Sequence, residues 1–232
     1  MASELYTTHA AQYAESVTHN IYNAHYERPS LQALIGDIKG LKVLDLGCGS
    51  GIYAQYLLDK GASSVTCIDA SSEMLAMVDS TLGDRVHAYQ QDLALGLPNE
   101  KTQSADVVIC PLMLHYLADV TAFFAEVYRV LKPGGYMVFS THHPCAKSEM
   151  RHAKNYFETQ MVIERWNTVG TPVEVRFYRR SLTCIMQAIT QNGLLVSALS
   201  EGQVDPVVQT MCAKTYEKLS TRPAFIFIRC QK

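Results

Sequence analysis

Three glycines at alternate positions are the first residues of this chain whose spacing suggests chemistry. Residues 43–51 read VLDLGCGSG and contain Asp45, Gly47, Gly49 and Gly51. They stand where a buried strand is expected to turn into a helix. Glycine permits the tight dihedral angles of such a turn and lets a ligand approach the backbone closely. This geometry serves a nucleotide-like cofactor, although the dinucleotide fingerprint would need a glycine at position 52, where the chain has Ile52.

Two carboxylates follow the glycine turn at the ends of later predicted strands. Asp69 comes eighteen residues after Gly51, where a carboxylate can accept hydrogen bonds from both hydroxyls of a ribose. Asp92 follows the next predicted strand. Either aspartate alone is more typical of a helix cap or a solvated loop. Their joint spacing after the glycine turn, within one alternating pattern of strands and helices, is a stronger signal than either aspartate alone.

Histidines follow the fourth and fifth predicted strands, whose carboxyl ends should face the ligand of an open parallel sheet. His115 lies in the segment CPLMLHYL and could accept a proton near neutral pH; the alternative is a histidine packed at a helix start. His142 and His143 could reach the same place. With Cys145 and His152 they match no common zinc spacing, so no metal site is expected.

Alternating strand and helix signals predict the scaffold for these residues. They indicate an α/β fold with a doubly wound, mostly parallel sheet and helices on both faces. The expected strands are 41–46, 65–68, 85–90, 105–110, 136–141, 194–200 and 224–230. The expected helices are 4–17, 29–38, 50–60, 73–80, 120–131 and 181–192. Two extended segments within 156–178 predict a hairpin inserted over the sheet, and the pattern over 207–219 is ambiguous but permits a helix.

Composition limits the function classes. The chain has 232 residues, 48% of them apolar, which suits one domain with a substantial core. A formal charge of −2 supplies no general field for nucleic acid. No apolar run long enough to span a membrane and no leader-like N-terminus are present, and the seven cysteines include no Cys-x-x-Cys pair. We therefore expect a cytoplasmic protein with reduced thiols, bound to neither nucleic acid nor membrane; its oligomeric state stays open.

The glycine turn with its two aspartates resembles the class I S-adenosylmethionine-dependent methyltransferases, which have a Rossmann-like, seven-stranded fold. The resemblance implies S-adenosylmethionine as cofactor and S-adenosylhomocysteine as product. In this family Asp92 would receive the adenine amino group and Met74 would lie against adenine. The cofactor-binding residues implied are Asp45, Gly47, Cys48, Gly49, Gly51, Asp69, Ala70, Met74, Asp92, Leu93, Cys110 and Tyr22.

The segment CPLMLHYL resembles the small-molecule branch of this family, related to the ubiquinone and phosphoethanolamine methyltransferases, and lacks the Asn/Asp and paired prolines of base-methylating enzymes. The resemblance implies a small acceptor methylated at oxygen, nitrogen or carbon by in-line displacement. His115 and His143 are the implied catalytic residues. The implied substrate-binding residues are Tyr26, His142, Tyr178 and Arg179.

The expected organisation is a single methyltransferase domain over residues 1–232, with an N-terminal helical cover over 1–38 and an inserted lid over 144–180. Tyr22 and Tyr26 are favoured over Tyr13 as the aromatic residues that enclose the cofactor. Two other functions stay open: an NAD-dependent oxidoreductase, which Asp69 favours and Ile52 opposes, and a non-catalytic S-adenosylmethionine-binding protein.

Overall fold

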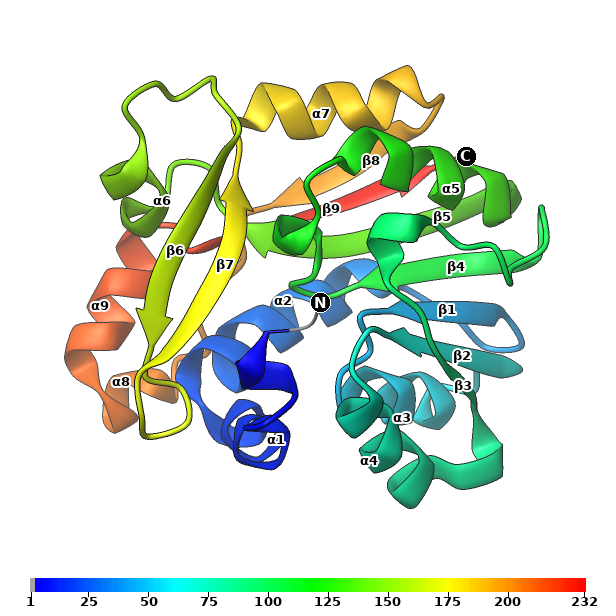
Figure 1. The fold of residues 1–232 in the computed structure, drawn as a ribbon, viewed down its shortest axis with the longest axis horizontal. Helices are drawn as coiled ribbons and strands as arrows, with labels where there is room; N and C mark the ends of the chain where they lie inside the picture. Colours follow the sequence, from blue (N-terminus) through cyan, green and yellow to red (C-terminus); the bar gives the residue numbers. More distant parts are fainter. Residues whose placement is uncertain (1–2) are drawn as a thin grey trace.

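Seven strands form the central sheet of the computed structural model, which describes residues 3–232 apart from the side chains of residues 147, 148 and 152. Their order is β3-β2-β1-β4-β5-β9-β8, with the first five parallel and β9 antiparallel to both of its neighbours. The strands are β1 (Lys42–Leu46), β2 (Ser64–Asp69), β3 (His87–Gln90), β4 (Ala105–Cys110), β5 (Leu131–His142), β8 (Leu195–Ser200) and β9 (Phe225–Gln231). The predicted mostly parallel α/β sheet is confirmed (Figure 1).

Helices cover both faces of the sheet because successive side chains of a buried strand point to opposite sides. On β4, Val108 and Cys110 join the core that contains α5 (Val120–Val130) and α7 (Leu182–Gln191). Val107 and Ile109 join the opposite core. That second core includes side chains of α2 (Arg28–Ile35), α3 (Ile52–Asp59), α4 (Ser72–Leu82) and α9 (Ala213–Thr221).

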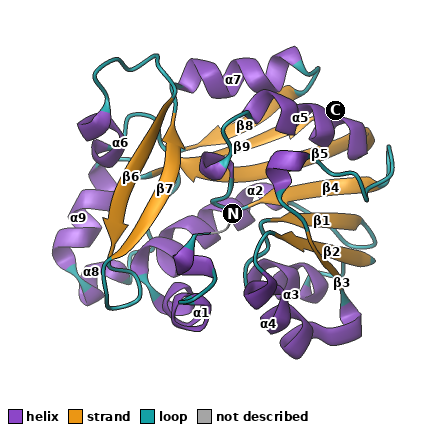
Figure 2. Cartoon of the chain, viewed as in Figure 1, coloured by secondary structure: helices purple, strands orange, loops and turns teal. Residues whose placement is uncertain are grey.

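A separate hairpin stands across one end of the large sheet, beside the N-terminal helix α1 (Ala10–His19) (Figures 1 and 2). Its strands are β6 (Gln160–Trp166) and β7 (Val173–Arg179), preceded by α6 (Lys147–His152). Leu5, from the short helical turn Glu4–Tyr6, is fully buried among the apolar side chains of the hairpin. The N-terminal segment and the hairpin therefore pack together over the sheet.

Several element boundaries differ from the sequence prediction; β5 begins at Leu131 and not at residue 136, and three further differences have a local reason. The helix expected over 4–17 is interrupted after Tyr6, whose carbonyl accepts a hydrogen bond from the Ser71 hydroxyl at 2.6 Å. The helix expected over 29–38 ends at Ile35, because Gly36 adopts a positive φ of 80°. Residues 207–219 contain α8 (Val208–Met211) and the start of α9, separated by the extended backbone of Cys212.

None of the helices within residues 3–232 combines the length and the apolar character needed to cross a lipid bilayer.

Candidate functional site

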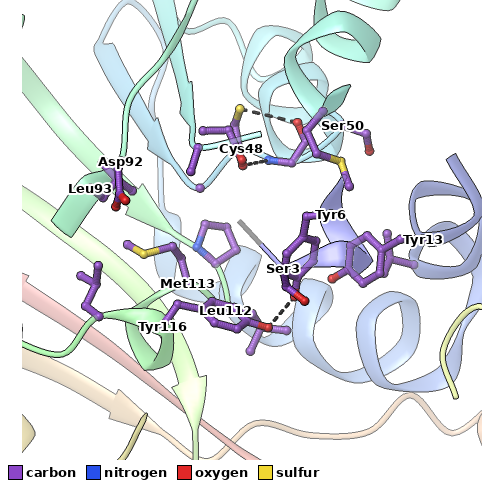
Figure 3. A pocket seen from close by; sticks show the side chains of 18 of the residues that line it. Ser3, Tyr6, Tyr13, Cys48, Ser50, Asp92, Leu93, Leu112, Met113 and Tyr116 are labelled. Atoms are coloured by element: carbon purple, nitrogen blue, oxygen red, sulfur yellow. Dashed lines mark hydrogen bonds between the residues drawn. The ribbon is translucent and has the colours of Figure 1, made fainter. Parts of the chain in front are cut away.

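A cavity of about 960 Å³ opens at the carboxyl end of the parallel strands, between the sheet, the N-terminal segment and the hairpin. Its size lies in the upper part of the range for small-ligand sites, roughly 300–1,000 Å³. Part of its wall is drawn in Figure 3. Of the predicted site residues, the cavity is lined by Gly47, Cys48, Gly49, Asp69, Ala70, Met74, Asp92, Leu93 and Tyr178.

The glycine turn after β1 brings backbone to the cavity wall. Gly47 has a φ of 75°, and a Cβ atom added there would lie only 2.7 Å from Cγ of Met113. The Gly47 and Cys48 amides donate to the carbonyl of Ile68 at 2.8 and 3.2 Å, which fixes the turn against β2. Gly51, with a φ of 86°, begins α3 and does not line the cavity. The turn thus needs glycine both for its dihedral angles and for space.

Asp69, at the end of β2, connects the glycine turn with the start of α4. Its Oδ2 accepts from the Gly49 amide and its Oδ1 from the Ser71 amide, both at 2.9 Å. Burial raises the pKa of Asp69, and the three backbone amides that hydrogen-bond to it oppose that shift. Each carboxylate oxygen has more than one acceptor position, so Asp69 can accept further bonds from a ligand in the cavity.

The wall beyond Asp69 comes from the ends of β2 and β3. Asp92 caps the short turn Leu93–Leu95 by accepting from the Ala94 amide at 3.0 Å, and it lines the cavity together with Leu93. Met74, in the first turn of α4, contributes an apolar surface nearby. The structure therefore places Asp69, Met74 and Asp92 on one wall of the cavity.

Two buried carboxyl groups lie at the other end of the glycine turn. Asp45 is 0% exposed, and neither of its carboxyl oxygens has a hydrogen-bond partner among the described residues. Burial, with the nearby charges of Asp69 and Glu27, raises the pKa of Asp45 to about 8. Glu27 lines the cavity itself, and burial raises its pKa to about 7. Sequence reasoning missed Glu27, because an acid before Pro29 at a helix start is explained by the helix alone.

Three tyrosines surround the cavity near the loop after β4, and none of them was among the predicted site residues. The hydroxyls of Tyr6 and Tyr116 are hydrogen-bonded at 2.5 Å, and the Tyr13 ring meets Tyr6 edge-on at 4.9 Å (Figure 3). Burial raises the pKa of each, so all three hydroxyls keep their protons near neutral pH. The N-terminal segment thus brings Tyr6 and Tyr13 beside a residue more than a hundred positions away.

Tyr22 and Tyr26, the tyrosines favoured from the sequence, lie outside the cavity wall. The Tyr22 hydroxyl accepts from Lys218 at 2.8 Å, and its ring meets Phe225 edge-on. Tyr26 is buried and stacks on Phe225 with ring centroids 5.6 Å apart. Both pack against the last strand of the sheet, a contact that depends on the tertiary fold.

The loop after β4 forms the wall beside the glycine turn, because β4 pairs with β1 and Met113 of this loop lies against Gly47. Pro111, Leu112 and Met113 line the cavity, whereas Cys110 is buried in the sheet beneath them. Leu112 has a φ of 48°, which is uncommon for a side chain of this size and costs of the order of 1–3 kcal/mol. Its amide donates to both the carbonyl and the hydroxyl of Ser140, at 3.1 and 3.0 Å, and these bonds hold the strained loop in place.

His115 points away from the cavity, although its neighbour Tyr116 lines it. It is 3% exposed, its Nδ1 lies 3.3 Å from Oγ1 of Thr141, and its ring stacks on His142 at 3.9 Å. Burial lowers the pKa of His115, and His142 and Arg180 act in the same direction. The structure therefore does not bring this histidine to the place where an acceptor would lie.

His142 and His143 also lie outside the cavity wall. Nδ1 of His142 is 2.9 Å from the buried carboxyl group of Glu149, and Nε2 of His143 is 2.9 Å from Glu201. Burial lowers the pKa of His143, and Glu201 acts in the opposite direction. These pairs join the end of β5 to the surrounding loops. Among the side chains that the structure describes, no three His, Cys, Asp or Glu residues gather closely enough to hold a metal ion.

The hairpin contributes alternate residues of β7 to the cavity. Glu174, Arg176 and Tyr178 share the face that lines it. Arg179 lies on the opposite face, where its guanidinium donates to the carbonyls of Asn155, Tyr156 and Glu158 at 2.9–3.1 Å. A strand alternates its side chains, so neighbours such as Tyr178 and Arg179 cannot face the same cavity. That alternation could have identified Glu174 and Arg176 once Tyr178 was chosen.

Comparison with known proteins agrees with this geometry. A family model described as a methyltransferase domain matches residues 44–139. An S-adenosylmethionine-dependent methyltransferase from Mesorhizobium loti superposes with a TM-score of 0.71 at 26% identity, covering 93% of this chain and 100% of that one. A putative S-adenosylmethionine-dependent methyltransferase from Listeria monocytogenes gives 0.76 at 26% identity, covering 89% and 96%.

A shorter match relates the chain to the ubiquinone biosynthesis O-methyltransferase of Pseudomonas entomophila. The two are 39% identical over 106 residues, which is 45% of each chain. This chain therefore matches less than half the length of that relative.

The cavity also fits the cofactor of these proteins. The glycine turn leaves no room for a Cβ at Gly47, and Asp69 can accept two hydroxyl groups. The carboxyl group of Asp45, which has no partner among the residues that the structure describes, is buried at the end of β1 just before the turn. An adenosine with a positively charged amino-acid group combines the features that such a wall can bind. With the strand order and the comparisons, this shows that the chain is a class I S-adenosylmethionine-dependent methyltransferase.

Proposed function

We propose that the enzyme methylates a small molecule held in the cavity between the loop after β4 and the hairpin. One observation carries this proposal: the glycine turn and the hairpin line the same cavity, which the N-terminal segment covers. The Ser71 hydroxyl fixes this cover through the Tyr6 carbonyl, and Ser3 donates to the Glu174 carbonyl at 3.3 Å. A covered cavity suits an acceptor that enters whole, and the ubiquinone methyltransferase relative supports the same class.

The proposed position of the cofactor follows from the strand order. Neighbouring strands lie about 4.8 Å apart, so an elongated ligand can extend along the edge formed by their carboxyl ends. Asp92 follows β3, Asp69 ends β2 and the glycine turn follows β1. Adenine would lie near Asp92 with Met74 and Leu93, the ribose at Asp69 beside Ala70, and the amino-acid portion against Gly47 to Gly49.

The proposed mechanism relies on positioning. The cofactor supplies a methyl group activated by its sulfonium, and displacement in line requires acceptor, methyl and sulfur to be collinear in a dry site. Leu112 and Met113 exclude water from one side. Tyr6, Tyr13 and Tyr116 stay protonated and can donate hydrogen bonds that orient the acceptor. We assign no proton transfer to His115 or His143, because neither lines the cavity.

The acceptor class can be tested with cofactor carrying an isotopic label on its methyl group. The purified enzyme would be incubated with a cell extract divided by size into metabolites, protein and nucleic acid. We expect label only in the metabolite fraction, and label confined to protein or nucleic acid would refute the proposal. Binding of NAD, measured in parallel with S-adenosylhomocysteine, should be absent.

Tyr116→Phe should lower kcat/KM for the acceptor about tenfold, which corresponds to one lost hydrogen bond in a dry site. The affinity for S-adenosylhomocysteine should stay within twofold, because Tyr116 follows β4 rather than the glycine turn. Steady-state kinetics and calorimetry measure the two quantities. Tyr128→Phe, on the outer side of α5, is the matched control and should change neither. An unchanged kcat/KM in Tyr116→Phe would remove this residue from the acceptor site.

We also propose that residues 1–232 act as one methyltransferase domain, with residues 1–38 as cover and 144–180 as lid. The shared packing of Leu5 with the hairpin supports this division. A cytoplasmic location is part of the proposal, supported by seven cysteines that are all free.

A further inference from the structure

Glu27 is a cavity residue whose position the class I fold by itself does not explain. It comes from the N-terminal cover, in the π-helical turn Asn23–Glu27, and is 3% exposed. Its Oε2 accepts from the Tyr53 hydroxyl at 3.0 Å, and its Oε1 accepts from the Ser140 hydroxyl at 2.6 Å. Tyr53 belongs to α3 and Ser140 to β5, so two elements of the sheet domain fix this carboxyl group in the wall.

The place of Glu27 along the cavity is set by these two hydroxyl groups. Tyr53 is in the first turn of the helix that follows the glycine turn, and Ser140 also holds the backbone of Leu112 in the loop after β4. Glu27 therefore lies on the β1, β4 and β5 side of the cavity. Asp69 and Asp92 lie on the β2 and β3 side. A ligand with its ribose at Asp69 reaches Glu27 with its other end.

The carboxyl groups on the β1, β4 and β5 side of the cavity have too little positive charge beside them to compensate their negative charge. The nearby Asp45 is buried without a hydrogen-bond partner among the described residues, and its charge and that of Glu27 oppose each other's ionisation. Arg28 follows Glu27 in the chain and favours its ionised form, but the Nη2 of Arg28 donates to the Val17 carbonyl at 2.9 Å. A buried carboxylate is stable when a cation comes within hydrogen-bond distance, so the ligand atom that fits here is positively charged.

We propose that Glu27 binds the α-ammonium group of the cofactor's amino-acid end. Tyr53 and Ser140 are positioning residues that leave the remaining acceptor positions of the carboxylate free for this cation. The inference rests on the proposed placement of the cofactor in this cavity. It adds a contact from the N-terminal cover to the amino-acid end of the cofactor.

The test uses three ligands that differ at the amino-acid end. S-adenosylhomocysteine has the ammonium and the carboxylate, its decarboxylated form keeps the ammonium alone, and methylthioadenosine has neither. Calorimetry at pH 8 should show that Glu27→Gln weakens the first two by about tenfold or more and changes methylthioadenosine less than twofold. Glu217→Gln, on the exposed side of α9, is the matched control and should leave all three affinities unchanged.

The pH dependence of binding gives a second measurement on the unmodified enzyme. Burial raises the pKa of Glu27 to about 7, against the hydrogen bonds from Ser140 and Tyr53 and the charge of Arg28, which favour its ionised form. The hydroxyls of Tyr53 and Tyr13 stay neutral, and Asp45 is the other carboxyl group nearby. As pH falls through this pKa value, Glu27 takes up a proton and loses the negative charge that binds a cation. Affinity for S-adenosylhomocysteine should fall roughly tenfold from pH 8 to pH 6, while that for methylthioadenosine stays flat.

Tyr53→Phe keeps the buried ring and removes one hydroxyl that stabilises the ionised Glu27, so the midpoint of this dependence should move to higher pH. That shift tests the inference even if Glu27→Gln fails to fold. Equal weakening of all three ligands by Glu27→Gln, or a pH-independent affinity in the unmodified enzyme, would overturn it. Failure of the unmodified enzyme to bind any of the three ligands would instead contradict the proposed cofactor site.

Discussion

Asp69→Ala is expected to weaken S-adenosylhomocysteine binding at least a hundredfold, about 2.7 kcal/mol. The substitution removes a carboxylate that can accept both ribose hydroxyls, and charge-assisted bonds of this kind contribute about 1.5–3 kcal/mol each. It also removes the acceptor of the Gly49 and Ser71 amides. The glycine turn and the start of α4 then lose their common anchor. Calorimetry with S-adenosylhomocysteine measures the loss directly.

Asp69→Asn separates the two roles of this side chain. The amide oxygen can still accept from one backbone amide, so the loop should remain ordered while one charge-assisted bond to the ribose is lost. We expect an intermediate loss of affinity, of the order of tenfold. Unfolding by urea should show that both variants keep a cooperative transition. An affinity for S-adenosylhomocysteine within threefold of the unmodified enzyme in Asp69→Ala would exclude a ribose contact.

Asp45→Asn is expected to stabilise the ligand-free protein at alkaline pH and to weaken cofactor binding at the same time. Burial raises the pKa of Asp45 to about 8 in the folded protein, whereas an unfolded aspartate ionises near 3.9. Ionisation therefore favours the unfolded chain between these values, and stability is lost as pH rises from about 4 to about 8. Asparagine does not titrate, so this loss disappears in the variant.

The folded and unfolded pKa values differ by about 4 units, so the expected gain at pH 8.5 is roughly 5 kcal/mol, or about 10–20 °C in Tm for a chain of this size. At pH 3 the variant should be no more stable than the unmodified protein, because Asp45 is then largely protonated in both the folded and the unfolded chain. Thermal unfolding of the ligand-free protein at the two pH values measures the difference. Binding of S-adenosylhomocysteine should weaken at least tenfold. A variant that is less stable at both pH values would show that Asp45 is a structural residue with a partner.

A buried acid that costs stability and supports ligand binding is expected at a functional site. The same reasoning applies to Glu27, whose pKa is also raised by burial, and it explains why neither residue would be selected by a search for well-packed cores. The Glu27 carboxyl group is held in place by the hydroxyls of Tyr53 and Ser140, whereas Asp45 is buried without a hydrogen-bond partner among the described residues. The cation that compensates them comes with the ligand, according to the proposed cofactor site.

The side of the cavity formed by the glycine turn and by the ends of β2 and β3 was predictable because it depends on local sequence. A glycine turn must follow its strand directly, and an acid at a strand end is carried to the ligand edge by any parallel sheet. Gly47, Gly49, Asp69 and Asp92 all lie in the wall for this reason. The alternation of strands and helices predicts the mostly parallel sheet, whereas the strand order comes from the structure.

The side of the cavity formed by the loop after β4 and the hairpin could not be predicted from the local sequence. His115 and Tyr116 are adjacent in the chain, yet one is packed against Thr141 and the other lines the cavity. The same holds for Arg179 and Tyr178 on the hairpin. Which of two neighbours faces a ligand depends on the rotation of one turn or on the register of one strand, and that is set by packing.

The sequence by itself therefore determined the fold and the methyl donor. The fold follows from the alternation of strands and helices, and the methyl donor from the glycine turn and the aspartates that follow it. Only the tertiary structure decided that Glu27, Tyr6 and Tyr13 reach the cavity, because their positions depend on how the N-terminal segment folds back over the sheet. Leu5 in the hairpin core and the Ser71 bond to Tyr6 hold that segment in place. Contacts between residues so far apart in the chain leave no periodic pattern that sequence reasoning could detect.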